Sequence, residues 1–378
     1  MADPLHPVAL QVAAAAPSAA CDSRPATAGW AAVGAARAAL DGQQWQEAAE
    51  LAGALLPAGA ADRPDDLALQ AQARLTLARA RWHLADLVDC CHQALRSAEL
   101  ARRSGGSDGQ AGEISAATLA AFALSELELQ DHALPLALKA LDLAQQAEHF
   151  RLLPVALSCA AHVHARLLDL LQSERLHMLA LSHARERRDL AALQLAYDNL
   201  LLSMNHLHRM AQRRGDLATQ QAVVQRAVAY TSHIRSLIEA ADLDEWRRIS
   251  LMQHLGELLG LTGRPAEALQ LLQDSLARAR RQDSAYLTLD AQTLLAELLQ
   301  RQGQPEAALA CLGDSLDSQA MGQAGYRRQH LGLQVARSCL LALGREAPAQ
   351  ELARRADTLQ SRHEQLRQDM LGRLALAH

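Results

Sequence analysis

Residues 250–276 read SLMQHLGELLGLTGRPAEALQLLQDSL, and residues 293–316 read TLLAELLQRQGQPEAALACLGDSL. When Gly263 is aligned with Gly303, a proline, an alanine and the closing Ser-Leu pair fall into register forty residues apart. Each copy has an apolar segment, a glycine turn and a second apolar segment that begins with proline, a residue favoured in the first turn of a helix. A repeat of fixed length predicts stacked helical hairpins.

The composition supports a helical chain. Aromatic residues make up only 3% of the 378 residues, while alanine and leucine are abundant. Strands favour aromatic and β-branched residues, and helices favour alanine and leucine. No alternating apolar run indicates a strand, so the sequence predicts an all-α fold.

The same period continues on both sides of the two copies. Equivalent positions of the second helices are spaced by 40 to 48 residues, and they are Leu56, Ala98, Leu141, Leu181, Val228, Leu276, Leu316 and Asp357. We therefore expect an α-solenoid of about eight antiparallel helix hairpins. The expected domains are a flexible Ala/Pro-rich tail at 1–28, a repeat array at 29–347 and a capping or linker helix at 348–378. The glycine-rich residues 104–112 are expected to form a loop.

The segment 255–276 resembles a tetratricopeptide repeat. It has the family's Leu-Gly pair at Leu255 and Gly256, its turn glycine at Gly263 and its small residue at Ala268. The period here is longer than the family's usual length of about thirty-four residues, and Leu, Met or His replace most of the family's large aromatic residues. The resemblance implies a right-handed superhelix whose first helices line a concave, peptide-binding groove.

First-helix residues that point away from the partner helix are expected to line that groove. Counted from the turn glycines and the second-helix positions, they are Thr118, Phe122, Ser158, His162, Arg166, Asn205, Arg209, Gln212, Arg213, Gln253, Glu257, Thr293 and Glu297. Their amide, guanidinium and carboxylate groups suit an extended peptide or an acidic segment. In tetratricopeptide relatives, Asn and Arg at such positions hold peptide backbone or carboxylate groups, so Asn205 and Arg209 are the first candidates. The alternative is that these residues only form the polar face of amphipathic helices.

Charge, hydropathy and cysteine usage indicate which classes of partner and which cellular compartment to expect. The formal charge of −5 provides no basic field that would indicate nucleic acid. No uninterrupted apolar stretch is long enough to cross a bilayer, so we expect no membrane contact. The six cysteines include no C-x-x-C pair, which favours a reduced, cytoplasmic location.

The sequence contains no recognisable catalytic or cofactor motif. It lacks a G-x-S-x-G motif, a P-loop and a G-x-G-x-x-G motif. His162 and His164 are two positions apart on an expected helix and point to different faces, which disfavours a metal site. The adjacent Cys90 and Cys91 are expected to be core residues. We therefore expect no enzyme activity, no metal and no cofactor, whereas an enzyme with an unrecognised site would show a closed polar pocket.

The last helix has two interpretations. Leu352, Leu359 and Leu366 recur every seven residues, as in one seam of a coiled coil, but Arg355 and Arg362 occupy the intervening seam positions. The helix either caps the last hairpin or projects as a linker or homodimer helix. The final residues RLALAH resemble the run that leads into the catalytic domain of diguanylate cyclases, although no GGDEF-type motif is present.

These patterns lead to two functional hypotheses. The first is a non-catalytic scaffold that binds a peptide or protein segment in the groove. The alternative is a sensory or regulatory module of a bacterial signalling protein, which passes a signal through the C-terminal helix.

Overall fold

The computed structural model describes residues 28–42, 44–56, 64–240, 243–318, 321 and 325–376. These residues form sixteen α-helices and one 3₁₀ helix, and no strand occurs among them. The all-α prediction is therefore confirmed. Residues 1–27 lie outside the described residues, so the flexible tail stays a prediction.

The described chain forms two compact units. The N-terminal unit contains residues 28–200 and 367–376, and the C-terminal unit contains residues 201–366. The N-terminal unit includes α2 (Ala28–Asp41), α3 (Trp45–Ala54), α4 (Pro64–His83), α5 (Leu87–Ser104), α6 (Gly106–Glu126), α7 (Gln130–Gln146), α8 (Leu153–Arg166), α9 (Leu170–Glu186) and the start of α10 (Leu190–Arg214). The C-terminal unit includes the rest of α10, α11 (Leu217–Ile238), α12 (Glu245–Leu261), α13 (Pro265–Arg281), α14 (Ala285–Arg301), α15 (Pro305–Leu312), η2 (Gly313–Asp317), α17 (Tyr326–Ala342) and most of α18 (Glu346–Leu376).

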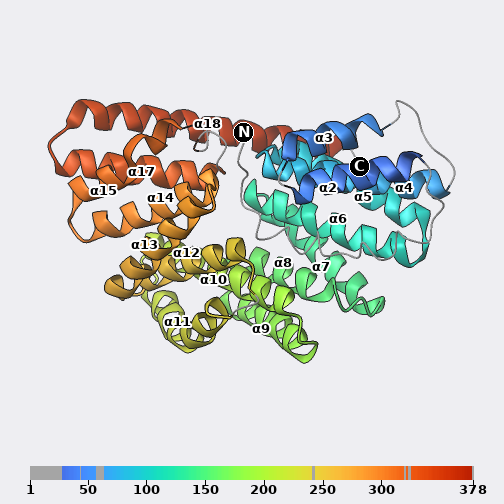
Figure 1. Cartoon of the computed structure of the whole chain (residues 1–378), viewed down its shortest axis with the longest axis horizontal. Coiled ribbons are helices and arrows are strands. Elements are labelled where there is room, and N and C mark those ends of the chain that lie inside the picture. The colour runs from blue at the N-terminus through green and yellow to red at the C-terminus, as the bar shows by residue number, and fades with distance from the viewer. Residues whose placement is uncertain are drawn as a thin grey trace. The chain divides into compact units, whose positions relative to one another are not determined.

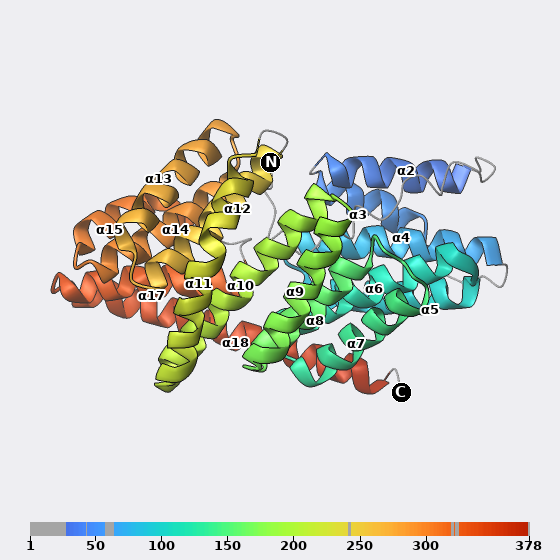
Figure 2. The ribbon, with the colours of Figure 1, turned by 90° about the horizontal axis from the view of Figure 1, so that it is seen from below.

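Within each unit, the helices stack in chain order (Figures 1 and 2). From α2 to α9 and from α11 to α15, each helix packs on the next helix in the chain, as in the series α12, α13, α14 and α15. First helices of successive hairpins also touch, for example α4 with α6 and α12 with α14. This contact pattern is that of a helical-repeat solenoid, as predicted.

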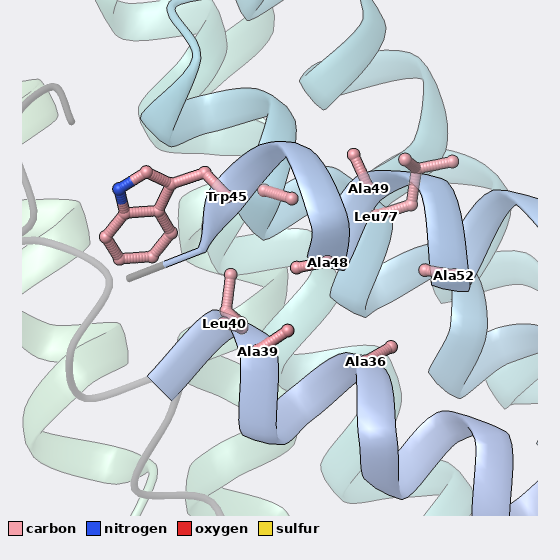
Figure 3. Close-up of a cluster of buried hydrophobic side chains, with 9 residues drawn as sticks. Ala36, Ala39, Leu40, Trp45, Ala48, Ala49, Ala52 and Leu77 are labelled. Atoms are coloured by element: carbon pink, nitrogen blue, oxygen red, sulfur yellow. The ribbon is translucent and has the colours of Figure 1, made fainter. Parts of the chain in front are cut away.

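Small side chains allow the two helices of a hairpin to lie close together. In the first hairpin, Ala48 and Ala52 of α3 face Ala36 of α2, and all three side chains are fully buried (Figure 3). Trp45 closes the end of this cluster, and its ring stacks on His83 with 3.7 Å between ring centroids. Ala48 thus packs α3 on α2, and the Trp45 ring packs α3 on the end of α4.

Seven of the turns between paired helices contain one residue in the left-handed conformation, so the turn is a repeated structural feature. From α4 to α18, these residues are Ala85, Glu128, Leu168, Gly215, Gly263, Gly303 and Gly344, each with φ between 60° and 85°. In all seven turns, the next residue's N–H donates to a carbonyl oxygen five residues earlier at 2.8–3.0 Å. This hydrogen bond is characteristic of a helix that ends in a Schellman motif. The same turn geometry therefore occurs in all seven hairpins, including the three in which the left-handed residue is not glycine.

The prediction of a loop at 104–112 is wrong. Only Gly105, with φ +66°, separates α5 from α6. A Cβ on Gly109 would lie 2.6 Å from the Ala101 carbonyl oxygen, and one on Gly112 would lie 3.1 Å from Ala101 Cβ. These glycines permit close packing of α6 on α5.

Two second helices depart from the expected pattern. Val228 on α11 is 61% exposed, whereas Ala227 is 2% exposed, so the inward position lies one residue earlier than expected. The repeat alignment predicts that the second helix of the seventh hairpin reaches Leu316, but α15 ends at Leu312. Gly313 follows with φ +48°, a conformation that strongly favours glycine.

Candidate functional site

Three of the expected groove residues form an ionic cluster in the C-terminal unit. Arg209 of α10 donates to Glu257 of α12 through Nε at 2.9 Å and Nη2 at 2.7 Å. It also donates to Glu297 of α14 through Nη1 at 2.6 Å and Nη2 at 2.5 Å. Arg301 adds a hydrogen bond to Glu297 Oε1 at 3.0 Å. We call Arg209, Glu257, Glu297 and Arg301 the ionic cluster.

Burial and charge act in opposite directions on the ionic cluster. Burial alone would lower the pKa of the Arg209 guanidinium, but the charges of Glu257 and Glu297 and their hydrogen bonds outweigh it and raise that pKa. Burial also favours a higher pKa for Glu297, yet the charge and hydrogen bonds of Arg209, with those of Arg301, lower it. Both shifts favour the charged forms of Arg209 and Glu297, and these two charges are already paired within the chain.

Three neighbouring groove candidates are also engaged inside the C-terminal unit. Asn205 Nδ2 donates to the His254 carbonyl and to Glu257 Oε2, both at 3.1 Å. Gln253 Nε2 donates to the Leu287 carbonyl at 2.8 Å, and Thr293 Oγ1 donates to a carbonyl of its own helix. All three side chains are buried. Gln212 and Arg213, at the C-terminal end of α10, are exposed.

The groove candidates of the N-terminal unit are buried between α6 and α8. Phe122 packs on His162 with 5.6 Å between ring centroids. Arg166 Nη2 donates to the Ser125 carbonyl at 2.8 Å and to Glu126 Oε1 at 3.3 Å. Thr118 and Ser158 are also buried, and Thr118 Oγ1 donates to the Ile114 carbonyl at 2.8 Å. These polar groups join successive first helices.

The thirteen groove candidates therefore differ in accessibility. Only Gln212 and Arg213 are exposed; the others are buried or nearly so. Sequence reasoning placed them on the correct helices but could not separate polar groups that face solvent from polar groups that pair between neighbouring helices. Whether any of them contacts a partner stays a prediction.

A cavity of about 690 Å³ lies elsewhere in the C-terminal unit, between η2, α17 and α18. Its apolar walls are Leu316, Met321, Leu333 and Leu359, and its polar walls are Asp317, Ser318, Gln329, Glu351, Arg354, Arg355, Thr358 and Arg362. Sequence reasoning missed this site. The signal available was Gly313, which stands where the sixth hairpin has Gln273 in mid-helix.

The described residues were compared with the expectations for metal ligands and reactive cysteines. They contain no group of three or more His, Cys, Asp or Glu residues that could hold a metal ion. Burial raises the pKa of the Cys90 and Cys91 thiols, to about 12 for Cys91, which keeps them protonated and poorly nucleophilic. Cys90, Cys91, Cys159, Cys311 and Cys339 are all free thiols.

None of the described helices combines the length and the apolar character needed to span a bilayer.

Comparison with known proteins identifies one segment. Residues 247–320 match the family model of the tetratricopeptide repeat. The match covers nearly all of α12 and extends through α13, α14, α15 and η2, and it supports the resemblance inferred from the repeated sequence. A comparison with curated proteins finds no match.

Proposed function

We propose that this chain is a non-catalytic interaction module that binds a segment of a partner protein. Tetratricopeptide repeats generally mediate protein–protein interaction and are typically non-catalytic. The match over residues 247–320 is the observation that carries the proposal. The stacked hairpins support it, because a repeat fold offers an extended surface without requiring a closed pocket.

Gln212 and Arg213 are the proposed contact residues on the side of the first helices. Both are exposed, and they follow Arg209 by three and four positions on α10. Burial lowers the pKa of His330 on α17, and the positive charge of Arg213 lowers it further, which indicates that Arg213 lies near this helix. An exposed amide and an exposed guanidinium suit a backbone carbonyl and a carboxylate, respectively. The ionic cluster joins α10, the helix that carries Gln212 and Arg213, to α12 and α14.

A matched pair of charge reversals tests this proposal. Arg213→Glu changes the proposed surface, whereas Arg281→Glu makes the same change at an exposed residue at the end of α13. Tagged full-length variants are cross-linked in a lysate of the source organism, and the captured proteins are identified by mass spectrometry. We expect Arg213→Glu to lose partners that wild type and Arg281→Glu retain. Identical partners for all three proteins would contradict the proposed surface.

The packing of α18 supports the capping interpretation of this helix. Leu352 and Met370 are buried, and Leu359 packs beside the cluster formed by α15 and α17. The linker or homodimer helix and the signalling role stay predictions.

A further inference from the structure

The seventh hairpin has a shortened second helix. α13 in the sixth hairpin has 17 residues, whereas α15 has 8. Gly313 then adopts φ +48°, and the chain continues as a short 3₁₀ helix. About two turns of regular helix are therefore missing beside α18.

The missing turns leave part of α18 uncovered. α15, α17 and the first part of α18 belong to the same stack of helices (Figure 1). They share an apolar cluster that includes Leu312, Leu333 and Leu352. Beyond the end of α15, the cavity opens along α18 from Glu351 to Arg362. Its volume of about 690 Å³ lies within the range usual for ligand sites. The cavity is thus a consequence of the helix break at Gly313.

The walls of the cavity combine an apolar floor with a basic edge. Leu316, Met321, Leu333 and Leu359 provide apolar surface. Arg354, Arg355 and Arg362 line the same space, together with only two carboxylates, those of Asp317 and Glu351. A ligand that combines an apolar group with negative charge would complement both features.

The arginines can exchange their present partners for a ligand. Arg354 pairs with Glu351 at 2.5 Å, but both side chains are more than half exposed. Arg355 pairs with Asp317 at 2.8 Å and also donates to the Leu316 carbonyl. Exposed ion pairs contribute little net stability, so their exchange costs little. Arg362 is exposed, and no ion pair or hydrogen bond joins it to another described residue.

We propose that this cavity binds an acidic peptide segment with an apolar side chain. The apolar side chain packs on Leu333 and Leu359, and flanking carboxylates accept hydrogen bonds from Arg362 and Arg354. Arginine suits this role because its planar guanidinium can hold a carboxylate through two hydrogen bonds. The proposal rests on the proposed function and adds a second surface, formed by η2, α17 and α18, with defined partner chemistry.

The charges favour an acidic peptide over a nucleic acid. The chain has a formal charge of −5, and Asp317 and Glu351 stand at the cavity itself. Both features repel a dense row of phosphates. A peptide with a few carboxylates can approach the arginines, and its apolar side chain gains from burial on the floor.

The test uses the full chain and a fluorescein-labelled peptide, Glu-Asp-Leu-Phe-Glu-Glu, in fluorescence anisotropy titrations. A peptide with lysine in place of each acidic residue is the ligand control. Arg362→Glu reverses the charge at the cavity, and Thr358→Trp fills the cavity from an exposed position. Arg337→Glu makes the same charge change on an exposed residue of α17 outside the cavity. Circular dichroism verifies that each variant is folded.

We expect the wild type and Arg337→Glu to bind the acidic peptide with equal affinity and to show no binding of the lysine peptide. Arg362→Glu and Thr358→Trp should each weaken binding about tenfold or more, as expected for the loss of a charged hydrogen bond or of the apolar floor. No binding at millimolar peptide, or equal binding by Arg362→Glu and Arg337→Glu, overturns the proposal. Binding of a labelled RNA homopolymer that is lost in Arg362→Glu would also overturn it, in favour of nucleic acid. The Arg213→Glu experiment is independent of these titrations, so the proposed function can survive the failure of this cavity.

Discussion

Arg209 of α10 joins Glu257 of α12 to Glu297 of α14, two glutamates that occupy the same position in successive repeats forty residues apart. The Arg209 guanidinium therefore connects three first helices, α10, α12 and α14. The five N–H donors of arginine in a rigid plane suit this geometry, because each carboxylate receives two hydrogen bonds. The repeat places the two glutamates at equivalent positions, and the arginine comes from α10, which has 25 residues against 17 in α12.

Removal of Arg209 should destabilise the C-terminal unit. Arg209→Ala removes the guanidinium between two carboxylates, leaving Glu257 with Asn205 and Glu297 with Arg301. Breaking a buried ion pair costs up to about 3–5 kcal/mol, so we expect a loss at or below this range. The free energy of unfolding from urea titration, followed by circular dichroism, measures this loss.

Two further variants identify the cause. Arg213→Ala removes an exposed arginine one turn later and should change the free energy of unfolding by less than about 0.5 kcal/mol. Adding Glu257→Gln and Glu297→Gln to Arg209→Ala should recover part of the loss, because neutral side chains cost less to bury. An equal loss in Arg213→Ala would show that the ionic cluster is not the cause.

The left-handed turns predict a pair of opposite effects. Ala85 and Gly263 occupy the same turn position with φ 60° and 85°. Ala85→Gly should raise the free energy of unfolding by up to about 1 kcal/mol, because relief of left-handed strain exceeds the entropy cost of glycine. Gly263→Ala should lower it by about 1 kcal/mol. Urea titration of both variants checks the signs, and a loss in Ala85→Gly would refute the assignment of strain.

Close packing at Gly256 predicts a steric cost. A Cβ at this position would lie 2.8 Å from both Cγ and Cδ2 of Leu272, so the paired helices α12 and α13 would have to separate. Gly256→Val should cost about 1–3 kcal/mol, as is usual for overpacking. Gly34→Val, at an exposed helical glycine with no atom within 4 Å of its Cβ position, should be tolerated. Melting temperatures that fall equally in both variants would contradict the packing argument.

His177 predicts how stability changes at acidic pH. Burial lowers the pKa of this α9 side chain to about 3, and the nearby His162 contributes in the same direction. In the unfolded chain, the ordinary value is about 6.5, so between these two values the unfolded state binds more protons. The free energy of unfolding should therefore fall by about 1.4 kcal/mol for each pH unit as the pH is lowered through this window.

A difference between variants isolates this histidine from other titrating groups. Urea titrations at pH 7, 6, 5 and 4 should show a shallower pH dependence in His177→Gln than in wild type. His132→Gln, at an exposed histidine of α7, is the control and should keep the wild-type slope. Parallel curves for wild type and His177→Gln would contradict the buried, neutral state of His177.

The repeat pattern predicted some features of the candidate site and not others. Counting from the turn glycines and the second-helix positions assigned Asn205, Arg209 and Glu297 to first helices, and these residues lie on α10 and α14. It could not reveal that their partners lie as many as 88 residues away, as between Arg209 and Glu297, because a polar residue has the same pattern on a groove and on a helix interface. The cavity beside α18 was missed because its lining residues come from η2, α17 and α18, and the repeat pattern does not say how closely these elements approach.

The sequence by itself determined the all-α fold and the period of the hairpins, because alanine, leucine, glycine turns and helix-starting prolines act through local geometry that repeats along the chain. Only the tertiary structure decided that α6 begins at Gly106, that Ala85, Glu128 and Leu168 adopt the conformation usually reserved for glycine, and that Arg209 pairs with Glu257 and Glu297. These outcomes depend on which helices approach one another and how closely, and such distances arise from packing between segments that are far apart in the sequence.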